Sequence, residues 1–239
     1  MSHPQNPNTH TPGVNPDIWN NFTSDPTTGV TIITADGVIA YINEQSARIF
    51  FDTPMNVEEL IGVSIYDLGF PKEWADERVK LMHKIVETGE RYLLRTIWHG
   101  KQQYSWMSPI SHDDEDQRDL VLVITRRIPG TQELHLGEGE IDVVSSDVIC
   151  LGELNVLTAR ELEILALLEQ GMSIKQIAAT LFRSTKTIEN HREAIGRKLN
   201  RTRGVELAVI AQSAGLRVDD HKRQRLGGVD SPKLESSGC

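Results

Sequence analysis

The chain has 239 residues, of which 38% are hydrophobic, and it carries a formal net charge of −9 at pH 7. This length fits about two domains, and the modest hydrophobic content leaves room for polar tails or a linker beside them. The acidic net charge of the whole molecule gives no indication of nucleic-acid binding, and no apolar run reaches the roughly 18 residues that predict a membrane span.

The cysteines and the chain ends indicate the cellular setting. Cys150 and Cys239 are the only cysteines, and neither has metal or redox spacing, so a reduced, cytoplasmic environment is expected. Residues 1–16 are polar and proline-rich and lack the apolar core of a secretion signal. We expect a disordered arm over 1–21 and a flexible tail over 217–239.

Short β-type runs and amphipathic stretches predict one domain over residues 22–128. An Asp-Gly turn between the first two runs is a strong hairpin signal, and Gly89 is expected to end the long helix. The predicted strands cover 29–34, 38–42, 91–98, 102–107 and 119–125, and the predicted helical stretches cover 43–51, 58–68 and 73–88. This order fits an α+β domain in which helices pack on one five-stranded antiparallel sheet.

Two stretches of this domain, DGVIAYINEQSARIFF at 36–51 and EELIGVSIYDL at 58–68, resemble PAS domains. Phe51 departs from the pattern, because many relatives have Gly there. The matching positions are Asn43, Ala47, Phe50, Leu60, Ile61, Gly62 and Leu68. The resemblance implies a sheet and helices around a space that holds either a ligand or only side chains, and it does not identify a ligand.

Several cofactors can be argued against, so no cofactor and no metal is assigned. No cysteine precedes position 150, which argues against a flavin–cysteine adduct. Haem-binding relatives use a histidine on the long helix, but His83 lies off the apolar stripe and is interpreted as a surface residue. Trp98 and Trp106 are interpreted as core residues. The run HDDED at 112–116 has metal-ligand chemistry, yet a solvated hairpin tip is the preferred interpretation.

Charge is distributed unevenly between the two halves of the chain. Residues 129–152 contain Gly-Glu steps and weak apolar alternation, and they are interpreted as a linker with room for a short ordered piece. Residues 154–216 carry nine Lys/Arg against six Glu, which leaves −12 on the remainder. Within them, residues 181–203 carry seven Lys/Arg against two Glu. Such a basic island on an acidic chain is typical of a single domain that contacts phosphates.

Helix signals predict an all-α domain of four helices over 153–216, with a tight turn between the second (174–181) and the third. Capping boxes and a left-handed glycine mark the boundaries. The predicted boundary residues are Thr158 with Glu161, Gly171, Ser173 with Gln176, Ser184 and Thr202. The expected apolar stripe of the last helix is Leu207, Ile210, Ala211 and Ala214.

The third helix has one apolar and one polar side. Its apolar side consists of Ile188, His191, Ile195 and Leu199, so His191 is interpreted as a packing residue. The polar side suits the major groove, where Lys186 can reach guanine, Asn190 adenine, and Glu189 or Glu193 cytosine, with further groups left to hold phosphates. The full set of candidate DNA-contacting residues is Ser173, Lys175, Arg183, Ser184, Lys186, Thr187, Glu189, Asn190, Arg192, Glu193, Arg197 and Lys198.

Three motifs in this domain, LTxRE at 157–161, GxSxKxIAxxL at 171–181 and TIExHxxxIxxKL at 187–199, resemble the LuxR-type helix-turn-helix. The resemblance covers about 157–216 and implies a tetrahelical DNA-binding domain that commonly dimerises through its last helix. Many relatives have Lys where Glu189 stands, so base preference is not transferred.

The preferred function is a sequence-specific transcriptional regulator, in which the PAS-like domain senses a signal or dimerises and controls the helix-turn-helix. Expected partners are double-stranded promoter DNA, a second copy of the chain and RNA polymerase, with no membrane. The alternatives are a response-regulator-like protein and a PAS-mediated interaction module without its own ligand. Neither a sigma-factor fragment nor an enzyme is favoured, since no promoter-melting domain and no catalytic motif is found, and no catalytic residue is assigned.

Overall fold

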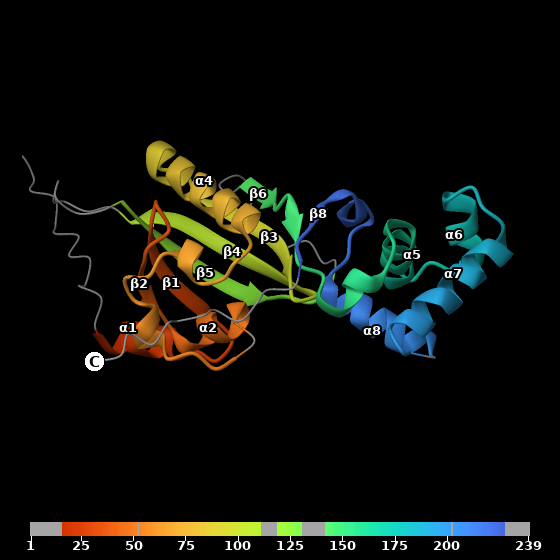
Figure 1. The fold of residues 1–239 in the computed structure, drawn as a ribbon, viewed down its shortest axis with the longest axis horizontal. Coiled ribbons are helices and arrows are strands. Elements are labelled where there is room, and N and C mark those ends of the chain that lie inside the picture. The colour runs from red at the N-terminus through yellow and green to blue at the C-terminus, as the bar shows by residue number, and fades with distance from the viewer. Residues whose placement is uncertain (1–15, 52, 111–118, 131–141, 202, 228–239) are drawn as a thin grey trace, which may run out of the picture.

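The structure, a computed structural model of the chain, describes residues 16–51, 53–110, 119–130, 142–201 and 203–227. An α+β domain and a helical domain lie next to each other along the long axis of the molecule (Figure 1). The N-terminal domain is α+β and the C-terminal domain is all-α, as the sequence predicts, but the sheet has six strands where five were expected.

A six-stranded sheet with the order β2-β1-β5-β4-β3-β6 is the framework of the N-terminal domain. Neighbours from β2 to β3 pair antiparallel, whereas β6 runs parallel to β3. The strands are β1 (Gly29–Thr34), β2 (Ile39–Ile42), β3 (Tyr92–Trp98), β4 (Lys101–Ile110), β5 (Leu120–Arg127) and β6 (Asp142–Ser145). This topology excludes the alternating parallel sheet that a response-regulator receiver needs.

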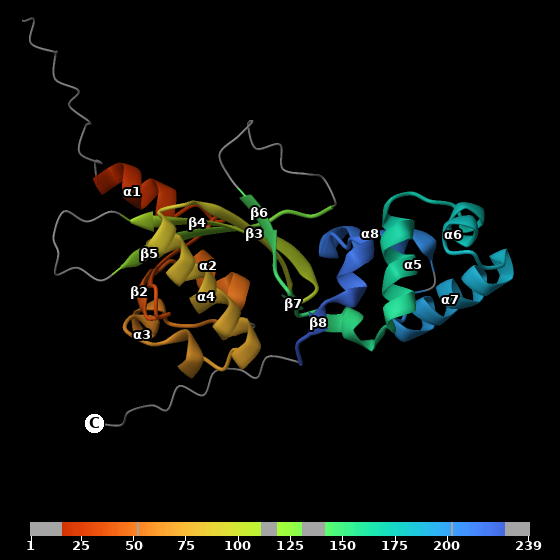
Figure 2. The same cartoon turned by 90° about the horizontal axis from the view of Figure 1, so that it is seen from above.

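Helices α2 and α4 pack on one face of this sheet (Figure 2). Gly89 ends α4 in the left-handed conformation, with φ 70°, as the sequence predicts. The helical elements of this domain are α1 (Pro16–Thr23), α2 (Glu44–Phe50), α3 (Val57–Leu60), the 3-10 helix η1 (Ile65–Asp67) and α4 (Lys72–Thr88). Between them and the sheet lies an apolar core in which Leu60, Leu68 and Ile85 are fully buried.

The helical domain has its own core and the predicted order of helices. Ile164, Leu165, Ile177, Ile188 and Ile195 are fully buried where its helices meet. Its elements are the 3-10 helix η2 (Gly152–Val156), α5 (Ala159–Glu169), α6 (Ile174–Thr180), α7 (Thr185–Lys198) and α8 (Gly204–Ala214). Both predicted capping boxes, at Thr158 and at Ser173, are formed.

The segment after α8 folds back toward the N-terminal domain. It forms the 3-10 helix η3 (Val218–Lys222) and the strand β8 (Gln224–Arg225), which pairs with β7 (Val148–Ile149). Leu226 is 4% exposed and belongs to the core of the N-terminal domain. We call residues 217–227 the return segment.

A buried ion pair joins the return segment to the sheet. Arg95 on β3 donates from Nη1 and Nη2 to the two carboxylate oxygens of Asp220 at 2.9 and 2.8 Å, and both side chains are 1% exposed. Arg95 also donates to the Gly215 carbonyl at 2.6 Å and to Gln102 Oε1 at 2.6 Å. Each of the three guanidinium nitrogens of Arg95 therefore has a partner, and these charge-assisted hydrogen bonds join the sheet to the end of α8 and to the return segment.

Two expectations about the chain's organisation are wrong, and the expected linker contains an ordered piece. Residues 16–21, expected within a disordered arm, lie in α1, whose Trp19 packs on Tyr41 at 5.7 Å between ring centroids. Residues 142–145 are the ordered piece of the linker, and they add β6 to the sheet because the free edge of β3 can pair with a short β-branched run. Residues 217–227, expected in a flexible tail, are ordered because Asp220 and Leu226 are buried against the N-terminal domain.

Other expectations fall outside the described residues. These are the remainder of the arm at 1–15, the hairpin tip at 112–116, the cap at Thr202 and the end of the tail at 228–239.

Candidate nucleic-acid interface and internal cavity

The turn between α6 and α7 sets the position of the third predicted helix. Ser184 begins α7 by accepting a hydrogen bond from the Thr187 backbone amide at 3.1 Å. Phe182 in the turn has φ 51°, a left-handed backbone conformation that a non-glycine residue seldom adopts. Ile188 and Ile195 anchor the inner side of α7, so its other side faces outward. His191 is half-buried at the edge of this inner side, in keeping with a packing residue.

Most of the twelve candidate DNA-contacting residues are exposed on α6, the turn and α7. Asn190, Lys186 and Glu193 lie on the solvent side of α7, whereas Glu189 and Thr187 are half-buried. The exposed members of the set are Ser173, Lys175, Arg183, Ser184, Lys186, Asn190, Arg192, Glu193, Arg197 and Lys198. The helical domain lies at one end of the molecule, and α7 faces away from the sheet (Figures 1 and 2).

Some of these candidates already have structural partners. Lys198 Nζ donates to Glu161 Oε2 at 2.6 Å, which ties α7 to the start of α5. Ser173 and Ser184 use their hydroxyls as helix caps. Lys186 Nζ lies 3.9 Å from Glu189 Oε2 on the surface. Asn190 and Glu193 are both exposed on α7, and Lys186 can exchange an exposed, weak pair for a DNA contact.

Glu161 illustrates how the domain holds α7 in place. Burial alone would raise the pKa of this carboxyl. Hydrogen bonds from Lys198 and from the backbone and side chain of Thr158 outweigh that penalty, and they hold the pKa of Glu161 below its ordinary value. At neutral pH the carboxylate is ionised and can pair with Lys198.

Sequence reasoning missed two features of this surface. Arg201 joins Arg192 and Arg197 along a groove of about 480 Å³ between α7 and the start of α8. The concentration of arginines over 181–203 was a usable signal for it. Phe182 is 88% exposed at the tip of the turn, and no periodic pattern predicts an exposed aromatic side chain there.

A cavity of about 70 Å³ lies between the helices and the sheet of the N-terminal domain. Apolar and aromatic side chains form most of the wall, including Phe50, Phe70, Trp74 and Met107. Phe70 and Trp74 stack with ring centroids 4.3 Å apart, which makes one side of the cavity flat. Trp98 belongs to the same aromatic cluster, as the sequence predicts.

One cation lines the cavity. Arg78 is 7% exposed; it pairs with Glu77, donates to Ser146 Oγ at 3.2 Å and lies over the Trp74 ring at 4.6 Å from the centroid. Burial lowers the pKa of Arg78 to about 10, and Glu77 limits the drop. Arg78 therefore stays protonated at neutral pH and is already balanced by a carboxylate.

The described residues show neither a cluster of three or more His, Cys, Asp or Glu side chains that could hold a metal ion nor a helix long and apolar enough to cross a membrane. His83 is on the surface, where its Nε2 lies 3.0 Å from Asp36 Oδ1. This placement agrees with the interpretation of His83 as a surface residue.

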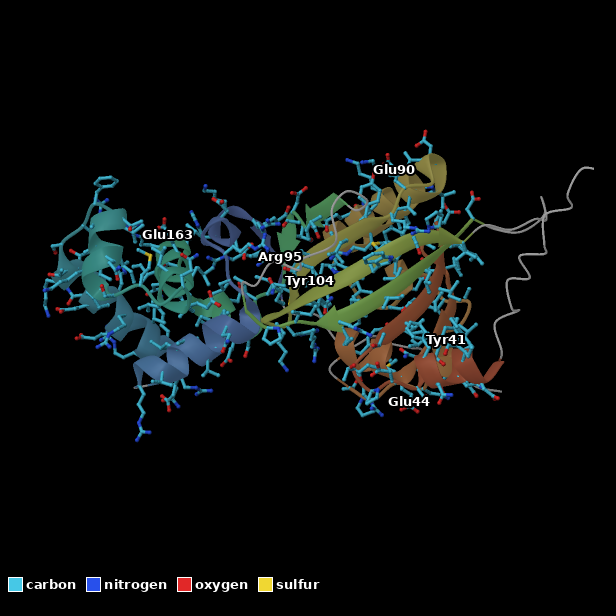
Figure 3. All side chains as sticks on the ribbon, turned by 180° about the vertical axis from the view of Figure 1, so that it is seen from behind. Tyr41, Glu44, Glu90, Arg95, Tyr104 and Glu163 are labelled. Carbon is cyan, nitrogen blue, oxygen red and sulfur yellow. The ribbon has the colours of Figure 1, made fainter. Side chains whose placement is uncertain are left out.

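Strand β4 connects the cavity to the joint between the domains. Successive side chains of a strand point to opposite faces. Gln103 lines the cavity, and Gln102 on the other face accepts a hydrogen bond from Arg95 and donates to the Ile128 and Gly130 carbonyls at 2.9 and 2.6 Å. Figure 3 shows Arg95 and Tyr104 at the end of the sheet that meets the helical domain.

Comparisons with known proteins identify the helical domain. Residues 155–211 match the family described as GerE, bacterial regulatory proteins, luxR family. The putative transcription regulator BvgA of Bordetella pertussis is 44% identical over 63 residues, which cover 26% of this chain and 30% of that protein. The oxygen regulatory protein NreC of Staphylococcus epidermidis is 28% identical over 198 residues, covering 76% of this chain and 84% of that protein.

Among solved structures, the complex of Vibrio cholerae VqmA with ligand and DNA is similar in outline, with 19% sequence identity and a TM-score of 0.47. It covers 92% of this chain and 97% of that one. By contrast, the residues that match BvgA span only about 30% of the length of that protein. The C-terminal segment is a LuxR-type helix-turn-helix DNA-binding domain, and the sequence-based assignment of this domain is confirmed.

Proposed function

We propose that the whole protein is a sequence-specific transcriptional regulator that binds promoter DNA through α7 and is controlled by its PAS-like domain. The observation that carries this proposal is the exposed polar side of α7, held by a buried inner side within a LuxR-type domain. It acts by binding and not by turnover, in the cytoplasm, and RNA polymerase is its expected partner at the promoter.

The twelve candidate residues divide into two roles in this proposal. Asn190 and Lys186, with Glu189 and Glu193, would read base edges in the major groove. Lys175, Arg183, Arg192 and Arg197 would contact phosphates and fix the register of the helix. The base-reading residues would then determine which DNA sequence is bound. The phosphate-contacting residues would determine how steeply the binding constant falls as the salt concentration rises.

A homodimer is the proposed DNA-binding form. Val205 and Val209 on α8 are 75% and 54% exposed, and they lie one helical turn apart on a helix whose Leu207 and Ala211 are buried. Exposed valines four residues apart form an apolar stripe that a second α8 can cover. Two linked reading helices gain affinity through effective concentration.

Salt-titrated DNA binding tests the proposal. The DNA would be genomic fragments enriched by the wild-type protein, with a scrambled fragment for comparison. We expect Asn190→Ala together with Lys186→Ala to weaken target binding at least tenfold and to leave scrambled-DNA binding within about threefold. Arg183→Ala should weaken both and reduce the slope of log K against log salt by about 0.9.

Lys80→Ala, an exposed charge removal on α4 of the other domain, serves as the matched control and should change neither quantity. Unchanged target binding by the Asn190→Ala, Lys186→Ala variant would refute the assignment of α7 as the reading helix.

Control by the PAS-like domain is proposed from the placement of Gln102 and Gln103. A ligand that holds Gln103 restrains the same strand position from which Gln102 contacts Arg95. Ligand binding in the cavity would then bias how firmly the DNA-binding domain is held. By thermodynamic reciprocity, DNA must change the affinity for that ligand by the same factor.

A further inference from the structure

The polar side of α7 continues beyond the residues that are proposed to read bases. Lys186, Asn190, Glu193 and Arg197 follow one another at spacings of four, three and four residues, so a helix with 3.6 residues per turn places them in one stripe. The stripe lies on the side of the helix opposite Ile195, which is fully buried. Arg197 therefore extends the base-reading side of α7 by about one helical turn toward its C-terminal end.

A basic groove adjoins this end of the stripe. Arg192, Arg197 and Arg201 line the groove of about 480 Å³ between α7 and the start of α8, and Glu193 is the acidic residue among the lining side chains. We call it the arginine groove. Three cations against one carboxylate give it a positive balance, which favours an anionic partner. Because the groove is continuous with the base-reading stripe, a DNA backbone fits it better than a separate acidic protein does.

Arg201 is held at this groove by the way α7 ends. Asn200 has φ 51°, and after it the Arg201 backbone amide donates to the Gly196 carbonyl at 2.8 Å. A Cβ at Gly196 would lie 2.6 Å from the Arg201 carbonyl oxygen, so the close approach needs glycine. Arg201 Nη1 also donates to the carbonyls of Leu199 and Asn200 at 3.3 and 3.2 Å. The backbone at the end of α7 therefore fixes where this cation lies.

The guanidinium of Arg201 nevertheless keeps donors for a phosphate. Its Nη2 lies 4.0 Å from Glu153 Oε2, and the two side chains are 40% and 56% exposed. An exposed pair of this kind contributes at most about 1 kcal/mol, so a phosphate can replace Glu153. Arginine carries five N–H donors, which leaves enough of them for a phosphate beside the two carbonyl contacts.

The length of α7 places the arginine groove far from the other phosphate-contacting candidates. Lys175 and Arg183 lie on α6 and in the turn before α7, whereas the arginine groove lies where α7 ends and α8 begins (Figures 1 and 2). The 14 residues of α7 span about 21 Å at a rise of ~1.5 Å per residue. The major groove is only about 12 Å wide, and a phosphate backbone runs along each of its edges. Groups at the two ends of α7 can therefore reach opposite edges.

We propose that the arginine groove binds the phosphates of one DNA strand while α6 and the turn bind those of the other strand, so that α7 is held in the major groove from both edges. This inference rests on the proposed function, in which α7 binds DNA. Arg201 and Arg197 fix the tilt of α7 through contacts that carry no base sequence. Glu153, which lies in η2 at the start of the helical domain, loses its partner when DNA is bound.

Salt-titrated binding of the full chain tests the role of Arg201. The probe is a synthetic duplex with the sequence of a genomic fragment that the wild-type protein enriches. In Arg201→Gln the slope of log K against log salt should fall by about 0.9, so the variant loses about 3.5-fold less affinity than wild type between about 50 and 200 mM salt. Its preference for target over scrambled DNA should stay within about twofold of the wild-type value, because backbone contacts position and do not specify.

Two control variants accompany this measurement. Arg201→Lys loses the forked guanidinium but keeps the charge, so it should keep the wild-type slope. Arg91→Gln removes an exposed arginine of the N-terminal domain and should change neither the slope nor the preference. An unchanged slope in Arg201→Gln, or an equal loss of slope in Arg201→Lys, would overturn the proposal.

Neutral methylphosphonates, placed at one phosphate at a time, test which strand the arginine groove contacts. A substitution that removes the partner of Arg201 should weaken wild type and have no further effect in Arg201→Gln. The same comparison with Arg183→Gln locates the phosphate at the turn. We expect the two positions on different strands, and positions on the same strand would overturn the proposal. If wild type shows no sequence-specific DNA binding, the proposed function fails as well, whereas specific binding with an unchanged slope in Arg201→Gln refutes only the arginine groove.

Discussion

The buried pair of Arg95 and Asp220 gives the most decisive stability prediction. Asp220 accepts hydrogen bonds from Arg95 Nη1, Arg95 Nη2 and the Arg217 backbone amide, and its carboxylate is also 2.9 Å from Arg223 Nε. Asp220→Ala removes all of these partners and leaves the Arg95 guanidinium, 1% exposed, without its counter-charge. Breaking one side of such a buried pair costs about 3–5 kcal/mol.

Two matched variants distinguish the stability lost with this buried ion pair from the stability lost when any charge is removed from the return segment. Asp219→Ala removes the neighbouring carboxylate, which is 76% exposed and pairs with Lys222 on the surface, and we expect no measurable loss of stability. The double variant Arg95→Met, Asp220→Leu replaces both charges by apolar side chains and should recover most of the stability, because neither charge is then buried alone.

Urea unfolding followed by two signals provides the assay. All four tryptophans precede position 107, so fluorescence reports the N-terminal domain, whereas helical circular dichroism also reports the C-terminal helices. In wild type the two transitions should coincide, and in Asp220→Ala the transitions should shift to lower urea and separate. A loss below about 1 kcal/mol in Asp220→Ala, or equal losses in Asp220→Ala and Asp219→Ala, would refute the reasoning.

Three further predictions concern single features. Leu226→Ala should lower the free energy of unfolding by about 2–5 kcal/mol, measured by urea melts, because it empties a 4% exposed site in the N-terminal core; a loss near zero would contradict that packing. Gly215→Ala should destabilise the joint between the domains, seen as a lower melting temperature, since φ is 53° and the new Cβ would lie 2.4 Å from the Gln102 side chain. The Glu161 contribution should be full above pH 4.5 and lost as pH falls through the lowered pKa, so acid unfolding of Glu161→Gln should be shallower than that of wild type, whereas parallel curves would argue against it.

Local signals in the sequence were sufficient for most of the fold. The Asp-Gly turn, the glycine after α4 and the capping boxes at Thr158 and Ser173 each fix a boundary through a short-range interaction, and each lies where it was predicted. The spacing of Ile188 and Ile195 likewise predicted which side of α7 is buried. These features depend on neighbours a few residues apart, which periodicity can detect.

The long-range features could not be predicted from patterns of this kind. Arg95 lies in an alternating strand and Asp220 in a polar tail, and 125 residues separate them. Nothing in either local stretch indicates that the two charges meet and are buried. The cavity is similar, since α2, α4 and the sheet form its wall together only in the folded domain.

The return segment also has a consequence for how the chain is made. Translation delivers the N-terminal domain first, yet its core receives Leu226 and its buried Arg95 receives Asp220 only after the whole helical domain has emerged. A product that stops before position 220 contains a complete helix-turn-helix but leaves a buried cation uncompensated, so its N-terminal domain opens more readily to proteases. The return segment therefore makes the stability of the N-terminal domain depend on synthesis of the complete helical domain and of the residues that follow it.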